Sequence, residues 1–592
     1  MKNKHILLCL AAAAIIGTAC SDDFLAVKPL SLLTPESALI SDAGLEALLN
    51  QMCKHLRSDY YENKGQLCCE LVLSDMAVSA YKDASAPHNF DVQLTPNAEG
   101  LAYDFFSTWT RGYNQTRNAN TVLQYVDKAD ISEARKNEIK AEALFHRSFW
   151  FFRLVNTYGD VPFMSKNYTS PKSDFRTHDR KTILKKIQED MEWAVQYLPE
   201  EVSPGRINRA AGNHLLAKIC TENFDFEGAV RAATAVINDG RHALMTQRFG
   251  SYASDPEYDV IWDLHQCENK SLSNNTEGIL VVQDRYGLRG ATSGGTEAMS
   301  RYTPNYWNAA YLLDPAGKRG MIDTKGNPYV IKWGRGVGYV RPCSYYNYEV
   351  WQNCGADLRH DTKHNWFTPD MYVYNNPSSK YYGQPVQKSM IKSKKDTIHC
   401  WFPWPFYKVY VKDEIRPDQP YGGNGDWYLF RIAETYLIRA EAYWWLGKTD
   451  LAANDINAVR TRALAPPVAA SDVTLDYILD ERARELYTEE FRHAELARIA
   501  FMMAEKGLNG YSLDNFSEKN YWYDRVMAKN ELYRPGNIMW GTAVFKVSPY
   551  HVLWPIPENA IVTNVGGVIN QNQGYPGCEK NEAPLTVIDD SQ

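Results

Sequence analysis

Aromatic side chains interleaved with glycine, arginine and asparagine gather in the middle of this 592-residue chain. Sugars present C–H faces to aromatic rings and hydroxyl groups to polar side chains, so this combination suits a carbohydrate site. Any single ring in such a stretch is more often packed in a core. We expect at least two of these rings to form a platform open to a ligand. The predicted ligand-binding residues are Tyr81, Tyr302, Tyr306, Trp307, Trp333, Arg335, Tyr345, Tyr346, Trp351 and Trp366.

The densest group of carboxylates lacks the pattern of a catalytic pair. A glycoside hydrolase needs two carboxyl groups about 5–10 Å apart across a cleft, one of them with a raised pKa. Here the acidic residues alternate with arginines along one predicted helix, which is typical of an ion-paired or solvated face. The sequence therefore predicts no catalytic residues and no enzyme activity. The acidic residues are Asp480, Glu481, Glu485, Glu489 and Glu490, and the arginines are Arg482, Arg484 and Arg492.

Metal and cofactor sites have little support from the sequence. His360 and His364 are four residues apart, but no HExxH glutamate accompanies them, so surface histidines are the better interpretation. The glycines of residues 334–338 lack the GxGxxG spacing of a dinucleotide loop and indicate backbone turns. Removing Cys9 and Cys20 from the 11 cysteines leaves nine, an odd number without CxxC spacing. We therefore predict no cofactor, no metal site and no disulfide framework.

The amino terminus has the three parts of an export signal. Lys2 and Lys4 precede an apolar run over residues 6–16, and small residues come before Cys20. This run of about 11 residues is shorter than the roughly 20 that span a bilayer. We expect residues 1–19 to be a cleaved signal peptide and the mature chain to have no transmembrane helix. The ending Gly-Thr-Ala-Cys resembles the bacterial lipobox, which implies a lipid anchor on Cys20.

The overall charge makes nucleic acid an improbable partner. The formal net charge is -7, and no long block of lysine or arginine follows the amino terminus. Counterion release from a phosphate backbone could therefore supply little affinity.

The spacing of apolar residues divides the chain into helical and irregular segments. Apolar residues recur at helical spacing over residues 32–240 and 427–507. Between these regions, residues 241–426 are rich in tyrosine, tryptophan, glycine and proline and predict a loop-rich insertion. Residues 508–592 are expected to be irregular.

Local signals predict several helix ends. One helix is expected from near Trp427 to Gly447, because glycine can adopt the left-handed conformation that ends a helix. Another is expected to begin after a Thr474 cap and to continue to about Glu505. A third, strongly apolar helix is expected to end at Gly159.

Two segments have similar residues at positions that are 223 residues apart, for example Ala217 and Ala440, and this indicates an internal repeat. Small residues at matched positions let neighbouring helices approach closely, and the pattern is similar to the tetratricopeptide unit of about 34 residues. Such units usually stack into a scaffold. The matched residues are Ala217, Cys220, Ala229, Ala233 and Val236 in the first segment and Ala440, Tyr443, Ala452, Ile456 and Val459 in the second.

Four stretches that span most of the mature chain carry a family resemblance: Cys20 with SDDFL; EALFHRSFWFFRLVNTYGDVPF; FRIAETYLIRAEAYWWLG with DINAVRTRA and ILDERARELYTEEFR; and LWPIPENAIVTNVGGVINQNQGY. In this order they resemble the SusD/RagB family of Bacteroidetes nutrient-binding lipoproteins. The resemblance implies a mainly α fold of four tetratricopeptide-like helix pairs with a large loop-rich ligand-binding insertion.

The resemblance also implies a role for residues 20–592. It implies a lipid-anchored protein on the extracellular side of the outer membrane that captures oligosaccharides for a TonB-dependent SusC-like transporter. Some members of the family take up peptides, so peptide binding is an alternative. A surface glycoside hydrolase is a third and weaker alternative. The aromatic insertion matches no family motif, which leaves the ligand open.

Overall fold

The computed structural model describes residues 38–589, apart from 63, 99–100, 169, 309, 392, 537 and 541–542. The predicted signal peptide, Cys20 and the SDDFL segment lie outside these residues. No helix within the described part is long and apolar enough to cross a membrane. The helices are α4 (Asp42–Leu56), α5 (Ser58–Tyr61), α6 (Gln66–Val72), α7 (Phe90–Gln93), α8 (Ser107–Tyr125), α9 (Glu133–Tyr158), α10 (Arg180–Tyr197), α11 (Arg209–Glu222), α12 (Phe226–Ile237), α13 (Val260–His265), α14 (Ala298–Arg301), α15 (Pro328–Trp333), α16 (Ser344–Asn347), α17 (Lys394–Cys400), α18 (Phe406–Val409), α19 (Ile432–Trp445), α20 (Thr449–Arg462), α21 (Leu475–Leu486), α22 (Arg492–Glu505), α23 (Tyr521–Lys529) and α24 (Glu558–Val562).

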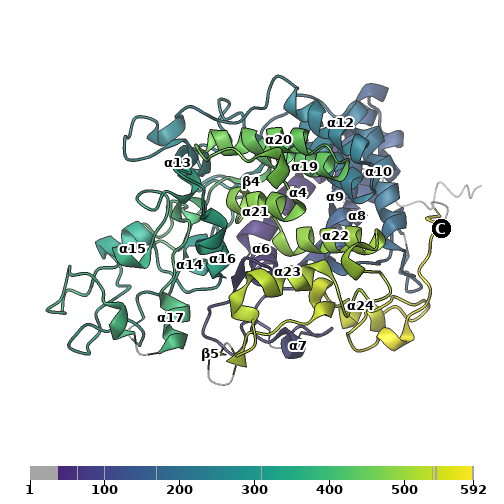
Figure 1. Ribbon diagram of the computed structural model, residues 1–592. Helices are drawn as coiled ribbons and strands as arrows, with labels where there is room; N and C mark the ends of the chain where they lie inside the picture. Colours follow the sequence, from purple (N-terminus) through teal and green to yellow (C-terminus); the bar gives the residue numbers. More distant parts are fainter. Residues whose placement is uncertain are drawn as a thin grey trace, which may run out of the picture.

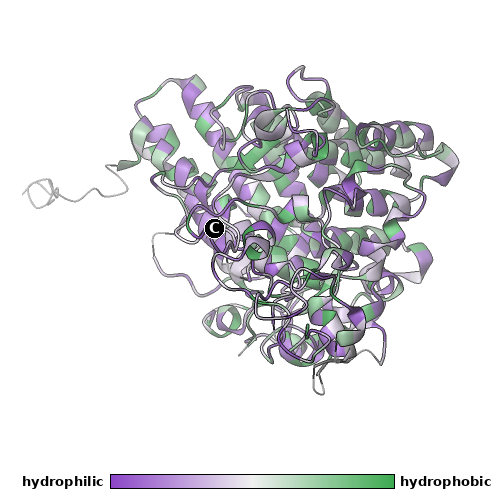
Figure 2. Ribbon diagram, turned by 90° about the vertical axis from the view of Figure 1, so that its left-hand side faces the viewer, coloured by the Kyte–Doolittle hydropathy of each residue, from purple (hydrophilic) through white to green (hydrophobic). Residues whose placement is uncertain are grey.

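Long helices from two distant parts of the chain pack into one array, which occupies the right-hand half of Figure 1. Helix α9 contacts α8 and α10, and α11 contacts α10 and α12. Helix α12 in turn contacts α19, which joins the amino-terminal helices to the later group. Hydrophobic and hydrophilic residues share the same helices in Figure 2, as amphipathic packing requires. The prediction of a mainly α fold is confirmed.

The two matched segments of the internal repeat each fold as a helix pair. The first pair is α11 with α12, and the second is α19 with α20. Small residues at matched positions are fully buried, including Ala217, Ala233, Ala440 and Ala452. The two pairs stack through the contact of α12 with α19. Assignment of these pairs to the tetratricopeptide class stays a prediction.

Helix ends set by short-range signals lie where they were expected. Gly159, with φ of 71°, ends α9, and the Thr474 side chain accepts from the backbone N–H of Tyr477 at the start of α21. Two expectations for this half of the chain are wrong. Residues Trp427–Arg431 form a strand, so that α19 begins only at Ile432. The helix after Thr474 ends at Leu486, and α22 is a separate helix.

The insertion forms a lobe of its own on the left-hand side of Figure 1. Between residues 241 and 426 its helices are only four to seven residues long and alternate with 3₁₀ turns and loops. Its centre is filled by rings rather than by long helices: Phe367 lies 4.1 Å from Trp333 and 4.3 Å from Trp404, between ring centroids. The aromatic residues of this region therefore build a core as well as a surface.

Two short strand pairs attach the insertion to the rest of the molecule. Strand β2 (Gly278–Val282) pairs antiparallel with β4 (Trp427–Arg431) at the start of α19. Strand β1 (Ala77–Val78) pairs with β3 (Arg341–Pro342). A third pair, β5 (Ile538–Trp540) with β6 (Ala543–Val544), lies in the carboxyl-terminal segment. The insertion is thus held by these two strand pairs, and a further backbone hydrogen bond runs from the N–H of Leu358 to the carbonyl of Ala463 at the end of α20.

A buried set of ion pairs, here named the charge network, joins the insertion to α20 and α21. Glu485 of α21 accepts hydrogen bonds from Arg359 of the insertion, Arg431 of β4 and Arg462 of α20. Each of these four side chains is no more than 2% exposed. A buried charge is tolerated only when it is paired, so each partner depends on the others. The charge network consists of Glu277, Asp357, Arg359, Lys408, Arg431, Arg462, Glu481, Glu485 and Glu489.

Candidate ligand-binding face

Six of the ten predicted ligand-binding residues are packed inside the insertion. Each is less than 9% exposed, so its ring has almost no face open to solvent. Tyr346, for example, stacks on Tyr487 of the scaffold at 4.1 Å and on Trp366 at 5.8 Å, between ring centroids. The six residues are Tyr302, Tyr306, Tyr345, Tyr346, Trp351 and Trp366.

The other four predicted residues, Tyr81, Trp307, Trp333 and Arg335, are half-buried. Trp307 and Arg335 lie together, with the guanidinium carbon 4.3 Å from the centroid of the indole ring. The Trp307 indole donates a 2.6 Å hydrogen bond to the carbonyl of Gly336. The two residues are brought together because α15 ends at Gly334, whose φ of 76° turns the chain toward Trp307. The Trp333 ring instead packs against the insertion core.

Arg335 also joins a second ring, that of the half-buried Tyr421. Its guanidinium lies 5.4 Å from the Tyr421 centroid and donates to the carboxylate of Asp323 at 2.6 Å. Arg416 covers the same tyrosine at 4.5 Å and donates to Asp413 at 3.0 Å. Guanidinium groups above aromatic rings are attracted by the ring quadrupole. The result is a partly exposed arrangement of rings and paired charges.

Tyr81 forms a second aromatic group with Tyr339. Their ring centroids are 4.5 Å apart in an edge-to-face arrangement, and the ammonium of Lys64 lies 5.2 Å from each. The pairing of Val78 with Arg341 between β1 and β3 places these tyrosines on neighbouring chain segments. Burial raises the pKa of Tyr339 to about 12, so its phenol stays protonated and can donate a hydrogen bond.

A chain of polar contacts connects the two aromatic groups. Arg301 lies 5.1 Å from the ring centroid of Tyr339 and donates to the Glu297 carboxylate. Glu297 also forms an ion pair with Arg416 at 3.5 Å. The Arg416 guanidinium in turn lies over the Tyr421 ring. We name the whole set the aromatic face. It consists of the half-buried residues Tyr81, Glu297, Trp307, Arg335, Arg416 and Tyr421 and of the buried residues Arg301 and Tyr339, which connect them.

Five members of the aromatic face, and Lys64 beside it, were not among the predicted ligand-binding residues. The five are Glu297, Arg301, Tyr339, Arg416 and Tyr421, which lie within residues 241–426, whereas Lys64 lies outside that region. The Gly422-Gly423 pair after Tyr421 is a sequence feature that could have drawn attention to this position. In the structure, a Cβ on either glycine would meet backbone atoms at 2.0–2.2 Å. Such a close backbone approach marks a segment that is folded against the lobe.

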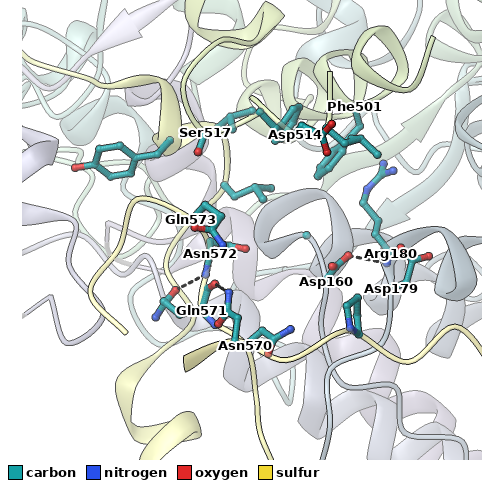
Figure 3. Close-up of a pocket in the computed structure, with 18 of the residues that line it drawn as sticks. Asp160, Asp179, Arg180, Phe501, Asp514, Ser517, Asn570, Gln571, Asn572 and Gln573 are labelled. Atoms are coloured by element: carbon teal, nitrogen blue, oxygen red, sulfur yellow. Dashed lines mark hydrogen bonds between the residues drawn. The ribbon is translucent and has the colours of Figure 1, made fainter. Parts of the chain in front are cut away.

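Several cavities lie apart from the aromatic face, and two of them lie in the insertion and beside the carboxyl-terminal segment. One, of about 430 Å³, is lined within the insertion by Tyr348, His360, Trp366 and Trp401 among others. The other, of about 580 Å³, lies between the scaffold and the carboxyl-terminal segment; in Figure 3 Asn570, Gln571, Asn572 and Gln573 face Asp160 and Arg180 across it. In this second cavity burial raises the pKa of Asp160 to about 6.

Glu481 and Glu485 of α21 are buried and ion-paired, and ion pairing was one of the two interpretations of their pattern. Arginine neighbours outweigh the opposing effect of burial, and they lower the pKa of Glu481 to about 2. Arg462, Arg431 and Arg359 hold the pKa of Glu485 well below its usual range, although burial opposes them. Both groups are therefore ionised at neutral pH, and neither could donate a proton as a general acid.

His360 and His364 do not share a helical face, because the 3₁₀ turn Leu358–His360 ends at the first of them. The His360 ring stacks on Trp351 at 4.7 Å, and His364 is exposed. Gly334 and Gly338 have φ values of 76° and 74°, which confirms the interpretation of this stretch as backbone turns. All nine cysteines of the described part are free thiols.

Comparison with known proteins gives consistent matches over most of the chain. A model described as "SusD family" matches residues 292–575, and one described as "Starch-binding associating with outer membrane" matches residues 23–220. The starch-binding protein SusD of Bacteroides thetaiotaomicron is 33% identical over 538 residues, which cover 86% of this chain and 84% of that protein.

Solved structures agree with the fold. A surface glycan-binding protein A from Bacteroides uniformis gives a TM-score of 0.59 at 19% identity, over 90% of this chain and 99% of that one. A laminarin-binding SusD-like protein gives a TM-score of 0.57 at 18% identity, over 90% of this chain and all of that one.

Proposed function

The chain belongs to the SusD family, and from this premise we propose that it is a surface glycan-binding protein that captures oligosaccharides and delivers them to a SusC-like TonB-dependent transporter. We further propose that it is held on the extracellular side of the outer membrane by a lipid on Cys20. It performs no catalysis. The names of the relatives support the binding class, since they describe starch, laminarin and glycan binding by those proteins.

The observation that carries the proposal is the aromatic face, and above all the contact of Trp307 with Arg335 and of Arg335 with Tyr421. Rings that are half-buried keep one side fixed by packing and leave the other available for stacking on a sugar. The adjacent guanidinium and phenol groups can bond sugar hydroxyls. Because the arginines of the face are paired with carboxylates, it carries little net charge, which suits a neutral oligosaccharide.

Calorimetric titration of the purified chain with panels of neutral glycans, acidic glycans and peptides tests the proposal. Neutral oligosaccharides should bind. Trp307→Ala should weaken binding about tenfold, which corresponds to about 1.4 kcal/mol and lies within the range of about 0.5–1.5 kcal/mol for an aromatic contact. Tyr382→Ala is the matched control, since Tyr382 is an insertion tyrosine that is 55% exposed outside the aromatic face.

Three results would contradict the proposal. Binding of peptides alone would favour the peptide-uptake alternative. Release of new reducing ends from a polysaccharide would favour a hydrolase. Equal weakening by Trp307→Ala and Tyr382→Ala would show that the aromatic face is not the binding site.

A further inference from the structure

Three side chains with metal-binding chemistry meet between two helices of the scaffold. Cys53 lies on α4, and Glu142 and His146 lie four residues apart on α9, which α4 contacts. The Cys53 sulfur is 3.6 Å from Oε1 of Glu142 and 3.6 Å from Nε2 of His146. One ligand atom from each residue lies within 4.8 Å of the others. The spacing of four along α9 places both of its ligands on one face of the helix.

These distances fit a tetrahedral zinc ion. With bonds of about 2.3 Å to sulfur and about 2.0 Å to nitrogen or oxygen, a sulfur and a second ligand on a tetrahedron are separated by roughly 3.5 Å. The two separations of 3.6 Å from the Cys53 sulfur are close to this value. In the absence of an ion, the Cys53 thiol can donate to Glu142 and accept from the Nε2–H tautomer of His146. Binding of an ion would satisfy all three groups together.

Charge balance and access support the same arrangement. A thiolate and a carboxylate supply two negative charges beside a neutral imidazole, and Glu46 supplies a third to the Arg206 guanidinium that also pairs with Glu142. These three charges compensate a divalent ion together with Arg206. Arg206 donates to both Glu142 oxygens at 3.0 and 2.7 Å and fixes the orientation of the carboxylate, as outer-sphere partners of metal ligands do. Cys53 and Glu142 also line a cavity of about 700 Å³, which supplies a path for an ion and room for water.

We propose that Cys53, Glu142 and His146 form a three-ligand site for a zinc-class divalent ion, with the fourth coordination position directed at this cavity. The ion would tie α4 to α9. Open sites of this kind keep a water molecule in the fourth position.

Zinc binds cysteine as the thiolate and histidine as the neutral imidazole. Coordination therefore replaces the thiol hydrogen of Cys53 with the ion, and one proton is released to solvent for each ion bound.

Titration of the chelator-treated full chain with Zn²⁺ tests the site. One ion per chain is expected, and Co²⁺ in its place should give the near-ultraviolet absorption band of a thiolate-to-cobalt charge transfer. Cys53→Ser should abolish that band and weaken zinc binding by more than about 100-fold, since outer-sphere changes alone cost about 10–100-fold. Cys578→Ser is the matched control, because Cys578 is also a half-buried free thiol.

A second measurement on the unmodified sequence protects the test against misfolding of a variant. Zn²⁺ should slow alkylation of Cys53, mapped by mass spectrometry, and leave the rate at Cys578 unchanged. The proposal is overturned if no zinc binds at one equivalent, if the cobalt band persists in Cys53→Ser, or if both cysteines are protected equally.

Discussion

Removing one charge from the charge network should destabilise the whole molecule. Glu485 is 2% exposed, and its two carboxylate oxygens accept from three arginines, including Arg431 at 2.5 Å and Arg359 at 2.9 Å. Glu485→Gln keeps the shape of the side chain but leaves these guanidinium groups without their shared counter-charge. Breaking a buried ion pair by removing one partner costs about 3–5 kcal/mol.

The expected change in melting temperature follows from the size of the chain. Unfolding entropy of about 2.1 cal/mol/K per residue, over roughly 550 described residues, amounts to about 1.2 kcal/mol/K. A loss of about 3–5 kcal/mol should therefore lower Tm by about 2–4 °C. Differential scanning calorimetry or a thermal-shift assay resolves a change of this size.

The matched control is Glu133→Gln at the start of α9. Glu133 pairs with Lys136 at 2.9 Å, but its side chain is 81% exposed. Exposed pairs contribute about 0–1 kcal/mol, so Tm should change by less than about 1 °C. If Glu485→Gln and Glu133→Gln behaved alike, the buried pairing described for Glu485 would not hold the insertion and scaffold together.

Three further results are expected. Because the pKa of Glu481 is low, the ionised carboxylate stabilises the fold above about pH 4.5, and this stabilisation is lost as pH falls toward about 2. The difference in free energy of unfolding between wild type and Glu481→Gln, measured in urea, should therefore shrink as pH falls over that range. The raised pKa of Asp160 has the opposite effect on stability, because ionisation of this buried carboxyl destabilises the fold as pH rises from about 3.8 to about 6. Relative to wild type, Asp160→Asn should therefore gain stability over that range and keep the gain at higher pH. Melting temperatures recorded as a function of pH test this. Gly159→Ala should lose about 1–3 kcal/mol in urea unfolding, because a residue with a Cβ rarely adopts φ of 71° with ψ of -125°. The loss should be larger if the Leu553 methyl, 2.9 Å from the new Cβ, cannot move. An unchanged midpoint would contradict the stated end of α9.

Features encoded by neighbouring residues could be predicted from the sequence, and features that depend on distant partners could not. The end of α9 at Gly159 and the Thr474 cap are local, and both are present. Residues Trp427–Arg431 were expected to be helical because their apolar residues continue the pattern of α19, but pairing with β2 makes them a strand. That partner lies roughly 150 residues earlier in the chain.

The same reasoning applies to the candidate site. Sequence patterns identified the aromatic insertion but could not separate its core rings from its surface rings, because both occur in the same glycine-rich turns. Trp307 and Arg335 remain partly exposed, whereas Tyr306, next to Trp307, is fully buried. The place of Tyr81 beside Tyr339 depends on the β1–β3 pairing, which joins segments more than 250 residues apart. Of the proposed metal ligands, Glu142 and His146 are four residues apart, but Cys53 lies 89 residues before Glu142, so no local spacing marks the complete set.

The attachment of the insertion by two strand pairs has a consequence for the energetics of capture. Backbone pairing of β2 with β4 and of β1 with β3, together with buried ion pairs, fixes the lobe before any molecule arrives. A preorganised surface loses little conformational entropy on association, so more of the gross contact energy remains as net affinity. Loosening either attachment should therefore weaken capture even where no residue of the aromatic face is altered.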